Sequence, residues 1–512
     1  MLQLKGSKLT IFILILLGLL ILPSLLPLIH SGFFLSDDGN WMVIRFSAFY
    51  EAIRQGQFPP RFLVRLNHGY GYPVADFLYP LFMYIGLPIK LLGMNFVNTV
   101  KIIFGLSIIF SGIFTFFWLR KSVGKLAAFI GAFVYVLFPY HMFDVYQRGS
   151  IGEVLALAIV PLALWQIERK NLIYTSLSIA LLILSHNSLA VLFLPIILIY
   201  IVYRKIFSFK EIGLILLLSL SFGAFFWIPA LYDKQFTIFD KTPVSDISTY
   251  FISIFSSLIG WITGLIIVFS LIFLRKKSQL SVKFFLALSI ISVFFVLPIS
   301  YPIWKLTHII PFFQFPYRFL SLTVLGISFL SGVTVELMPK KFKIFIVIAI
   351  VSVTYLSSWS YIFPKSYQYF PDTFYSTNQD STTVKNEYMP IWVKDFPTSY
   401  TDQKIKIITG DGVINDVAFN GSNIESSVIN NTKTITQLNI IYFPGWEVKV
   451  DGQRVNIFYE NSSGLIQFPV DTGGHTISAR FTETPIRLFA DIISIISIAG
   501  LIFFVVKKRY EK

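Results

Sequence analysis

The hydrophobic pattern of this chain is a series of long apolar runs separated by short polar segments. Runs of 16 to 25 residues recur along most of the 512 residues. Because an α-helix needs roughly 20 apolar residues to cross a bilayer, the pattern predicts a polytopic α-helical membrane protein. We expect about twelve spanning helices, near residues 9–29, 97–119, 126–142, 151–167, 171–186, 188–203, 211–231, 250–274, 283–299, 317–337, 342–361 and 486–506.

One further apolar run, residues 77–89, is too short to span. Its 13 residues give about 20 Å of helix, against a hydrocarbon core of roughly 30 Å. If this run crossed the membrane, every basic cluster from Arg120 onward would lie on the side opposite to Lys5 and Lys8. We therefore expect an interfacial or re-entrant helix within the first outer loop.

Basic residues gather in the short loops at alternate helix ends. These loops hold 21 of the 42 lysine and arginine residues. Because Lys and Arg mark cytoplasmic loops, we expect both termini in the cytoplasm of a multi-pass plasma-membrane protein. The other loops then face outward, and function should be sought there. These outer loops are residues 30–96, 143–150, the turn at 186–187, 232–249 and 300–316.

Residues 363–484 have a different pattern, in which apolar and polar residues alternate with period two. Val448 and Val450 share one face, and Asp451-Gly452 then offers a tight hairpin turn. We expect a linker and an extracytoplasmic β-sandwich of about eight strands, before the last helix. The expected domains are residues 1–362 (membrane domain with outer loop 30–96), 363–484 (linker and sandwich) and 485–512 (last helix and basic tail).

Composition supports the membrane class. The chain is 55% hydrophobic and only 13% charged, which is not the profile of a soluble protein. Its net charge of +15 is concentrated in the short loops, so we expect the lipid bilayer and no nucleic acid as a partner. The chain has no cysteine, which excludes disulfides and thiolate metal sites.

Two adjacent carboxylates, Asp37 and Asp38, follow the first apolar run. One interpretation is an acidic cap on the next helix. The other is a general base, because burial and mutual repulsion raise the pKa of at least one such carboxyl group. The pair also offers oxygen ligands for a divalent cation, although no further ligand is identifiable, so the metal stays undecided.

Four more ionisable residues lie at outer helix ends. Arg148 and Glu153 form a structural ion pair in one interpretation, and in the other Arg148 binds a phosphate group through its planar guanidinium. Arg318 either snorkels to the interface or contacts phosphate. His186 lies at an outer turn, where a polar turn residue and a substrate contact are both open interpretations.

Several motifs resemble one bacterial family of membrane proteins, the "6-pyruvoyl-tetrahydropterin synthase-related" or YfhO-like family. The motifs are Asp37-Asp38-Gly39, Gln57-Phe-Pro-Pro-Arg61, Gly69-Tyr-Gly-Tyr-Pro73, Tyr79-Pro80-Leu81, Pro139-Tyr140, Asp144-x-Tyr-x-Arg-Gly149 with Glu153, Ser185-His-Asn187 and Phe315-Pro-Tyr-Arg-Phe319. The resemblance covers most of residues 1–335. The sequence shows no zinc–histidine cluster of a pterin synthase.

The resemblance implies a GT-C-like architecture, that of multispanning glycosyltransferases with interfacial helices in the first outer loop. It also implies a polyprenyl-phosphate-linked sugar as donor and transfer with inversion. Asp38 takes the position of the catalytic acid of that loop, and Asp37 stands where relatives often have histidine. The same loop carries Arg61, His68 and Tyr70, which we expect to contribute to substrate binding.

The resulting hypothesis is a membrane glycosyltransferase that acts on a glycan, lipid or protein acceptor at the outer face. Asp38 would be the base, and Arg148 and Arg318 would offset charge on the departing phosphate. Two alternatives remain open. One is a lipid or glycan transporter, and the other is a non-catalytic envelope scaffold whose β-domain binds polymer.

Overall fold

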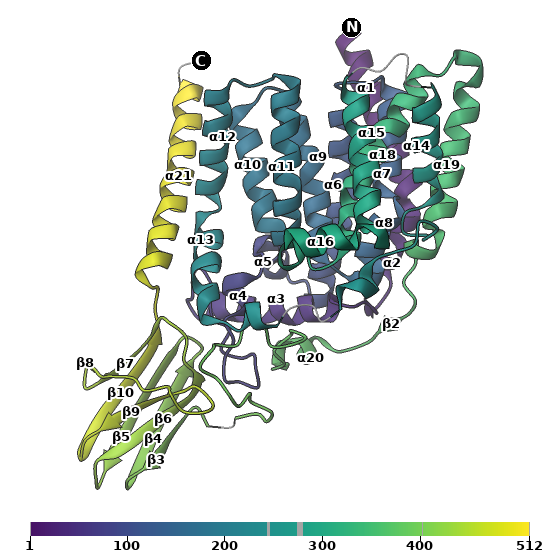
Figure 1. Cartoon of the computed structure of the whole chain (residues 1–512). Helices are drawn as coiled ribbons and strands as arrows, with labels where there is room; N and C mark the ends of the chain where they lie inside the picture. Colours follow the sequence, from purple (N-terminus) through teal and green to yellow (C-terminus); the bar gives the residue numbers. More distant parts are fainter. Residues whose placement is uncertain (1, 243–245, 274–279, 402, 511–512) are drawn as a thin grey trace. The chain divides into compact units, whose positions relative to one another are not determined.

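The computed structural model describes residues 2–242, 246–273, 280–401 and 403–510 (Figure 1). Several members of the basic clusters (Arg275, Lys276, Lys277 and Lys512) lie outside these ranges. The described chain forms two compact units. The first comprises Met1–Asn40, Val97–Leu220 and Val244–Tyr369, and the second comprises Trp41–Phe96, Ser221–Pro243 and Phe370–Lys512.

The first unit consists mainly of helices. They are α1 (Leu2–Ile21), α2 (Leu26–Ile29), α6 (Phe96–Leu119), α7 (Lys125–Val136), α8 (Pro139–Phe143), α9 (Ile151–Glu168), α10 (Leu172–Ser185), α11 (Asn187–Arg204), α12 (Phe209–Phe222), α14 (Trp261–Phe273), α15 (Leu280–Val296), α16 (Tyr301–Thr307), α17 (Ile310–Phe313), α18 (Leu320–Leu337) and α19 (Lys340–Ile362). One short antiparallel pair, β1 (Phe33–Phe34) and β2 (Tyr367–Gln368), joins the first loop to the segment after α19.

Helix α18 forms the centre of this unit and packs against α7, α14 and α15. A helix that is apolar on all sides is expected to be buried, and every residue from Leu320 to Val335 is buried. Small residues bring α18 and α7 close together. Ser328 Oγ donates a hydrogen bond to the carbonyl of Gly131 (2.8 Å), as in membrane helix pairs joined by small and hydroxyl residues.

The second unit combines helices with the strand region. Its helices are α3 (Gly39–Arg54), α4 (Val74–Phe77), α5 (Leu81–Leu91), α13 (Ala224–Asp233), α20 (Asp372–Thr377) and α21 (Pro485–Tyr510). Its strands are β3 (Ile405–Thr409), β4 (Gly412–Asn420), β5 (Asn423–Asn430), β6 (Thr434–Ile441), β7 (Trp446–Val450), β8 (Gln453–Arg454), β9 (Leu465–Val470) and β10 (Gly473–Phe481).

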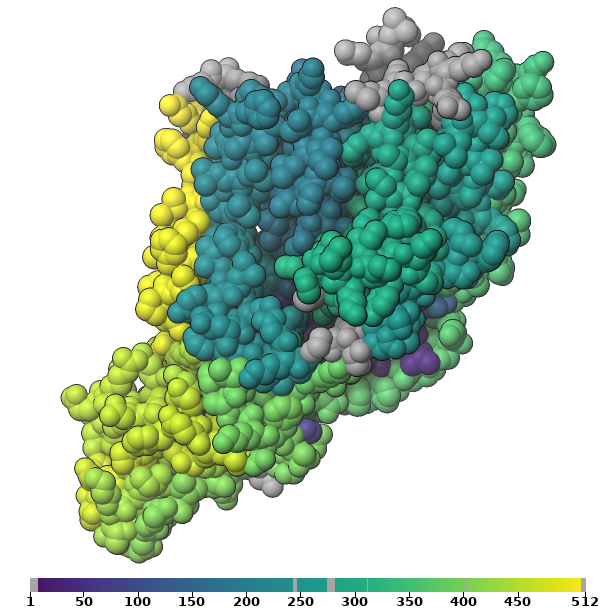
Figure 2. All heavy atoms as spheres, viewed as in Figure 1, coloured from purple at the N-terminus to yellow at the C-terminus, as the bar shows by residue number. Residues whose placement is uncertain are grey.

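The strands form two antiparallel sheets, ordered β4-β5-β10-β7-β8 and β3-β6-β9. Buried side chains from both sheets share one core, including Ile424, Leu438 and Ile477, so the strand region is the expected sandwich. In the space-filling view it forms one continuous lobe (Figure 2). The hairpin prediction is also confirmed, because Val450 pairs with Gln453 across a two-residue turn of positive φ at Asp451 and Gly452.

Among the described residues, six helices are long and apolar enough to span a membrane. The number rises to nine if each of three bent helix pairs counts as one span. A count of twelve would also need three of the shorter apolar helices, so the expected number is not confirmed. The run at residues 77–89 becomes α5, which has 11 residues and Pro88 inside it. The sidedness of the loops and termini stays a prediction.

Candidate active site

Backbone hydrogen bonds fix the loop that carries the two acidic residues. The N–H of Asp37 donates to the carbonyl of Gln147 (2.9 Å), and the N–H of Asp38 donates to the carbonyl of Arg148 (2.8 Å). Both acceptors belong to a five-residue π-helix, Asp144–Arg148, a type of turn that is frequent at functional sites. The first loop is therefore attached to the segment after α8 at two consecutive residues.

Gly149 permits this close approach. Its φ of +66° lies in the left-handed region, which glycine adopts without a steric penalty. A Cβ atom at this position would lie 2.5 Å from Ser36 Oγ and 2.8 Å from the backbone nitrogen of Gly39. A side chain at residue 149 would therefore force the acidic loop away from the π-helix.

Asp38 lies directly before α3 and next to Arg148. Its Oδ2 atom is 3.6 Å from Arg148 Nη2, and its side chain is 30% exposed. Its position before the helix fits the capping interpretation, and the ion pair fits the interpretation as a functional acid. The structure thus brings together Asp38 and Arg148, two of the residues that the sequence singled out, while their roles stay predictions.

Asp37 differs from Asp38 in its electrostatic setting. Its side chain reaches the surface, but partial burial raises the pKa of the carboxyl group above its ordinary value. The positive charge of Arg148 opposes this rise, and the neighbouring carboxylate of Asp38 adds to it. A raised pKa was expected for at least one member of the pair, and this member is Asp37.

The carboxylate of Glu153 joins the two arginines. Its Oε1 atom accepts hydrogen bonds from Arg148 Nη1 (2.6 Å) and Arg318 Nε (2.9 Å), and its Oε2 atom accepts one from the hydroxyl of Tyr140 (3.0 Å). Arg148 is 4% exposed, Arg318 is 5% exposed, and Glu153 is fully buried. The structural ion pair considered for Arg148 and Glu153 is present, and Arg318 is part of it.

Aromatic rings cover the guanidinium groups of the same cluster. The Phe315 ring centroid lies 5.3 Å from Arg148 Cζ and 4.9 Å from Arg318 Cζ, and the Tyr317 ring lies 5.4 Å from Arg148 Cζ. The two rings stack on each other with centroids 5.3 Å apart. Such cation–π contacts stabilise a desolvated guanidinium and limit its motion.

His186 completes the cluster from the turn between α10 and α11. Its Nδ1 atom accepts a hydrogen bond from the N–H of Leu189 (3.3 Å) and so caps α11. In the neutral ring the proton then belongs to Nε2, which lies 3.6 Å from Glu153 Oε1. His186 therefore has a structural role as a cap and also lies against the ionic cluster.

Asp144 is a member of the cluster that the sequence analysis did not select as a site residue. It is fully buried, and its Oδ1 atom lies 3.8 Å from Arg148 Nη1. Both of its carboxyl oxygens are buried without a hydrogen-bond partner in the described structure. The available signal was its spacing, because residues four apart on a helix are neighbours, as Asp144 and Arg148 are.

The other three site candidates lie in the second unit. Arg61 is 2% exposed and forms ion pairs with Asp491 (2.8 Å), Asp76 (3.4 Å) and Glu483 (3.6 Å). Asp76 also lies 3.8 Å from Arg487 Nη2. The sequence analysis did not find this second ionic cluster, because its two halves, Arg61 with Asp76 and residues 483–491, lie about 400 residues apart along the chain. Within it, Arg61 has the surroundings of a structural residue.

His68 and Tyr70 belong to a turn in the same unit. The N–H of His68 donates to the carbonyl of Gln379 (2.7 Å), and the His68 ring lies edge-on to Tyr400 with centroids 5.2 Å apart. The carbonyl of Tyr70 accepts a hydrogen bond from the N–H of Ile441 (2.9 Å) at the end of β6. These contacts fix the turn within the second unit, and the expected binding role of both residues stays a prediction.

In the part of the chain that the structure describes, no three histidine or acidic side chains are arranged to hold a metal ion. The divalent cation considered for Asp37 and Asp38 therefore has no identified third ligand among these residues.

Comparisons with known proteins give one family and a set of distant structures. A family model described as "6-pyruvoyl-tetrahydropterin synthase related domain; membrane protein" matches residues 76–363. No curated protein sequence matches significantly. Among solved structures, the apo oligosaccharyltransferase of Archaeoglobus fulgidus is 14% identical with a TM-score of 0.41, over 71% of this chain and 56% of that one.

Two further structures of the archaeal enzyme give similar values. The form tethered with an acceptor peptide is 14% identical with a TM-score of 0.41, over 75% of this chain and 60% of that one. The complex of AglB from A. fulgidus with an inhibitory peptide and a dolichol-phosphate is 13% identical with a TM-score of 0.38, over 73% and 56%. This chain thus spans little more than half the length of these structures.

Proposed function

This chain belongs to the 6-pyruvoyl-tetrahydropterin synthase related family of membrane proteins, and we propose that it is a membrane glycosyltransferase. The sugar comes from a polyprenyl-phosphate donor, and the acceptor is a glycan, lipid or protein of the cell envelope. Transfer takes place at the outer face of the membrane. The GT-C-like architecture and the catalytic acid in the first loop are part of this proposal.

One observation carries the proposal. A partly exposed carboxylate, Asp38, lies 3.6 Å from Arg148, and a single buried carboxylate holds Arg148 together with Arg318. An acid and two guanidinium groups are the residue types that transfer from a sugar phosphate needs. Ionisable groups that are buried inside a bundle of membrane helices are costly and usually mark functional sites.

The reaction is a single displacement at the anomeric carbon. Asp38 takes the proton of the acceptor hydroxyl, the hydroxyl oxygen forms a bond to the anomeric carbon, and the bond between this carbon and the phosphate oxygen breaks. The bonding electrons leave with the polyprenyl phosphate, and the configuration at the anomeric carbon is inverted. Each proton, bond and electron pair is thus accounted for without a further reactant.

Arg148 and Arg318 stabilise the charge that develops on the leaving phosphate. One well-placed donor of this kind lowers a barrier by roughly 3–4 kcal/mol. Glu153 orients both guanidinium groups, and the rings of Phe315 and Tyr317 hold them in place. A preformed cluster needs little reorganisation when the leaving group becomes charged.

The test compares envelope glycans by mass spectrometry in a deletion strain that carries either the wild-type chain or a variant. We expect Asp38→Asn to reduce the restored product at least 100-fold at an unchanged level of folded protein. Asp240→Asn, which changes an exposed aspartate on another loop, is the matched control and should restore the product fully.

Full activity of Asp38→Asn would reject the assignment of the base. A deletion strain that keeps all of its envelope glycans but has a mechanically weaker envelope would favour the non-catalytic scaffold instead.

A further inference from the structure

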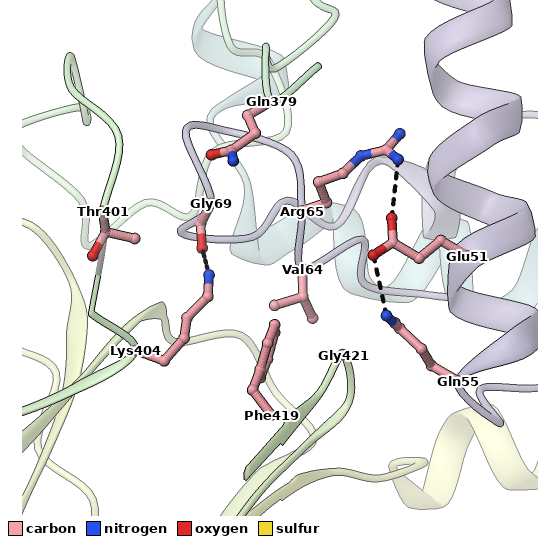
Figure 3. Close-up of a pocket in the computed structure, with 10 residues that line it drawn as sticks. All are labelled: Glu51, Gln55, Val64, Arg65, Gly69, Gln379, Thr401, Lys404, Phe419 and Gly421. Atoms are coloured by element: carbon pink, nitrogen blue, oxygen red, sulfur yellow. Dashed lines mark hydrogen bonds and ion pairs between the residues drawn. The ribbon is translucent and has the colours of Figure 1, made fainter. Parts of the chain in front are cut away.

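A small polar pocket lies within the second unit, formed by α3, the turn around Gly69 and the strand region (Figure 3). Its volume is about 140 Å³, against roughly 30 Å³ for one water in the liquid. The space therefore suits one small polar group and part of a ring, and it is too small for a polymer chain. The polar side chains that line it are Glu51, Gln55, Arg65, Gln379, Thr401 and Lys404.

The ammonium group of Lys404 is the cation that faces this space. Its Nζ atom donates to the carbonyl of Gly69 and lies 5.0 Å from the ring centroid of Phe419 (Figure 3). Among the described residues, no carboxylate lies within ion-pairing distance of Lys404. Arg65, by contrast, is paired with Glu51 at 3.0 Å. A half-buried ammonium without a counter-ion favours an anionic ligand.

Burial also lowers the pKa of Lys404 to about 8, and Glu51 opposes this change. Glu51 and Arg65 are the other charged groups that line the pocket. Burial thus disfavours the ammonium form, which predominates only below about pH 8. An anion that binds beside Lys404 would raise this pKa again, which gives the site a measurable signature.

Gly69 leaves room for such a ligand. Its φ is +82°, and a Cβ atom there would lie 3.0 Å from Gln379 Oε1 and 3.4 Å from Lys404 Nζ. Gln379 Oε1 is buried and has no hydrogen-bond partner in the described structure. The space beside Gly69 is thus bordered by an acceptor, Gln379 Oε1, and a cationic donor, Lys404 Nζ. A ligand that carries both a hydroxyl group and an anionic group would bind to both.

We propose that this pocket binds an acidic sugar unit, that is, a sugar that carries a carboxylate or a phosphate ester. Lys404 holds the anionic group, and Gln379 accepts a hydrogen bond from a sugar hydroxyl. Gln55 and Glu51 offer a further amide and carboxylate, and Phe419 offers an apolar ring. The inference goes beyond the proposed transferase and needs no part of the Asp38 site.

The experiment measures binding to the purified full-length protein in detergent by isothermal titration calorimetry. The probes are glucuronate and glucose 6-phosphate, with glucose, acetate and inorganic phosphate as partial ligands. We expect at least one acidic sugar to bind at least tenfold more tightly than each partial ligand. Lys404→Met should weaken this binding at least tenfold, while Lys433→Met, which changes an exposed lysine of the same sandwich, should leave it unchanged.

A second measurement uses only the wild-type protein. Titrations in buffers of different ionisation enthalpy should show uptake of about half a proton per bound glucuronate at pH 8 and almost none at pH 6, because Lys404 is already protonated at pH 6 and the sugar carboxylate stays ionised at both pH values. Three results would overturn the inference: no saturable binding of either acidic sugar, equal binding of inorganic phosphate, or binding at pH 8 without proton uptake. None of them bears on transfer by Asp38, so the two proposals can fail separately.

Discussion

Glu153 is the residue on which the cluster of the first unit depends. It is fully buried, and it accepts hydrogen bonds from two guanidinium groups and one phenol. A buried carboxylate is costly unless it is paired in this way. Glu153 is also the carboxylate that pairs with the buried Arg318, whereas Arg148 has Asp38 and Asp144 nearby as well.

We therefore predict that Glu153→Gln destabilises the protein strongly. The amide keeps the shape of the side chain but removes its charge, and breaking a buried ion pair costs roughly 3–5 kcal/mol. Thermal unfolding in detergent should show a lower midpoint and a lower folded yield. Glu168→Gln is the control on the same helix, because Glu168 pairs with Arg204, which is 30% exposed. Equal losses in the two variants would contradict the special role of Glu153.

A second residue-scale prediction concerns Asp37 and pH. Because its pKa is raised in the folded protein, the folded state binds more protons than the unfolded state between the ordinary and the raised pKa. Stability then falls as pH rises through this window. Asp37→Asn removes this loss of stability, so the thermal unfolding midpoint of the variant should exceed that of the wild type at pH 7. Because solvent screens the exposed side chain of Asp37, we expect a difference on the order of 1 °C.

The difference between Asp37→Asn and the wild type should disappear only well below the ordinary pKa of 3.8, where the carboxyl is protonated in both the folded and the unfolded state. Asp38→Asn is the matched variant and should have the opposite effect at pH 7, because it loses the ion pair with Arg148. A lower midpoint for Asp37→Asn at pH 7 would contradict the raised pKa.

At the scale of elements, the pair α7 and α18 holds the first unit together by close packing. The site residue Arg318 lies just before α18, in the 3₁₀ turn Pro316–Phe319. A Cβ atom on Gly131 of α7 would lie 2.8 Å from the carbonyl of Ser328 and 2.3 Å from Leu119 Cδ1. The backbones can approach this closely only because residue 131 has no side chain.

Gly131→Val should therefore separate α7 from α18. Overpacking of this kind costs roughly 1–3 kcal/mol, and contact with a backbone carbonyl leaves little room for relaxation. We expect a clear loss of thermal stability and of transfer. Gly264→Val in α14 is the control, because no atom lies within 4 Å of a Cβ atom at that glycine. Wild-type stability of Gly131→Val would show that the helices can be packed differently.

At the scale of the whole molecule, the distribution of charge predicts the topology. Half of the basic residues lie in short loops that we assign to the cytoplasm. The strand region and the first loop then face outward, which the proposed function requires. This orientation is a prediction from the sequence pattern.

Single-cysteine labelling tests the topology, because the native chain has no cysteine. Ser122→Cys lies in an exposed turn before α7, and Ser462→Cys lies in an exposed turn before β9. A membrane-impermeant maleimide should label Ser462→Cys in intact cells and Ser122→Cys only after lysis. Labelling of Ser122→Cys from outside would reverse the assigned orientation.

The sequence by itself determined the class of the protein and its two kinds of structure. Apolar runs indicate membrane helices because of bilayer thickness, and period-two alternation indicates half-buried strands because successive side chains point to opposite faces. Both signals are local, so the hairpin at Asp451-Gly452 and the buried alternation of Ile477, Ala479 and Phe481 could be predicted from a few residues. An ion pair between Arg148 and Glu153 was likewise one of two interpretations available from the sequence, because the two residues are only five positions apart.

Only the tertiary structure decided which distant charges meet. Arg318 reaches Glu153 across 165 residues of chain, and Arg61 reaches Asp491 across 430. The environment of Lys404 likewise depends on Gly69 and Gln379. Such contacts form because packing excludes water, and a buried charged group is then stable only beside a buried group of opposite charge. No periodicity along the chain encodes that choice.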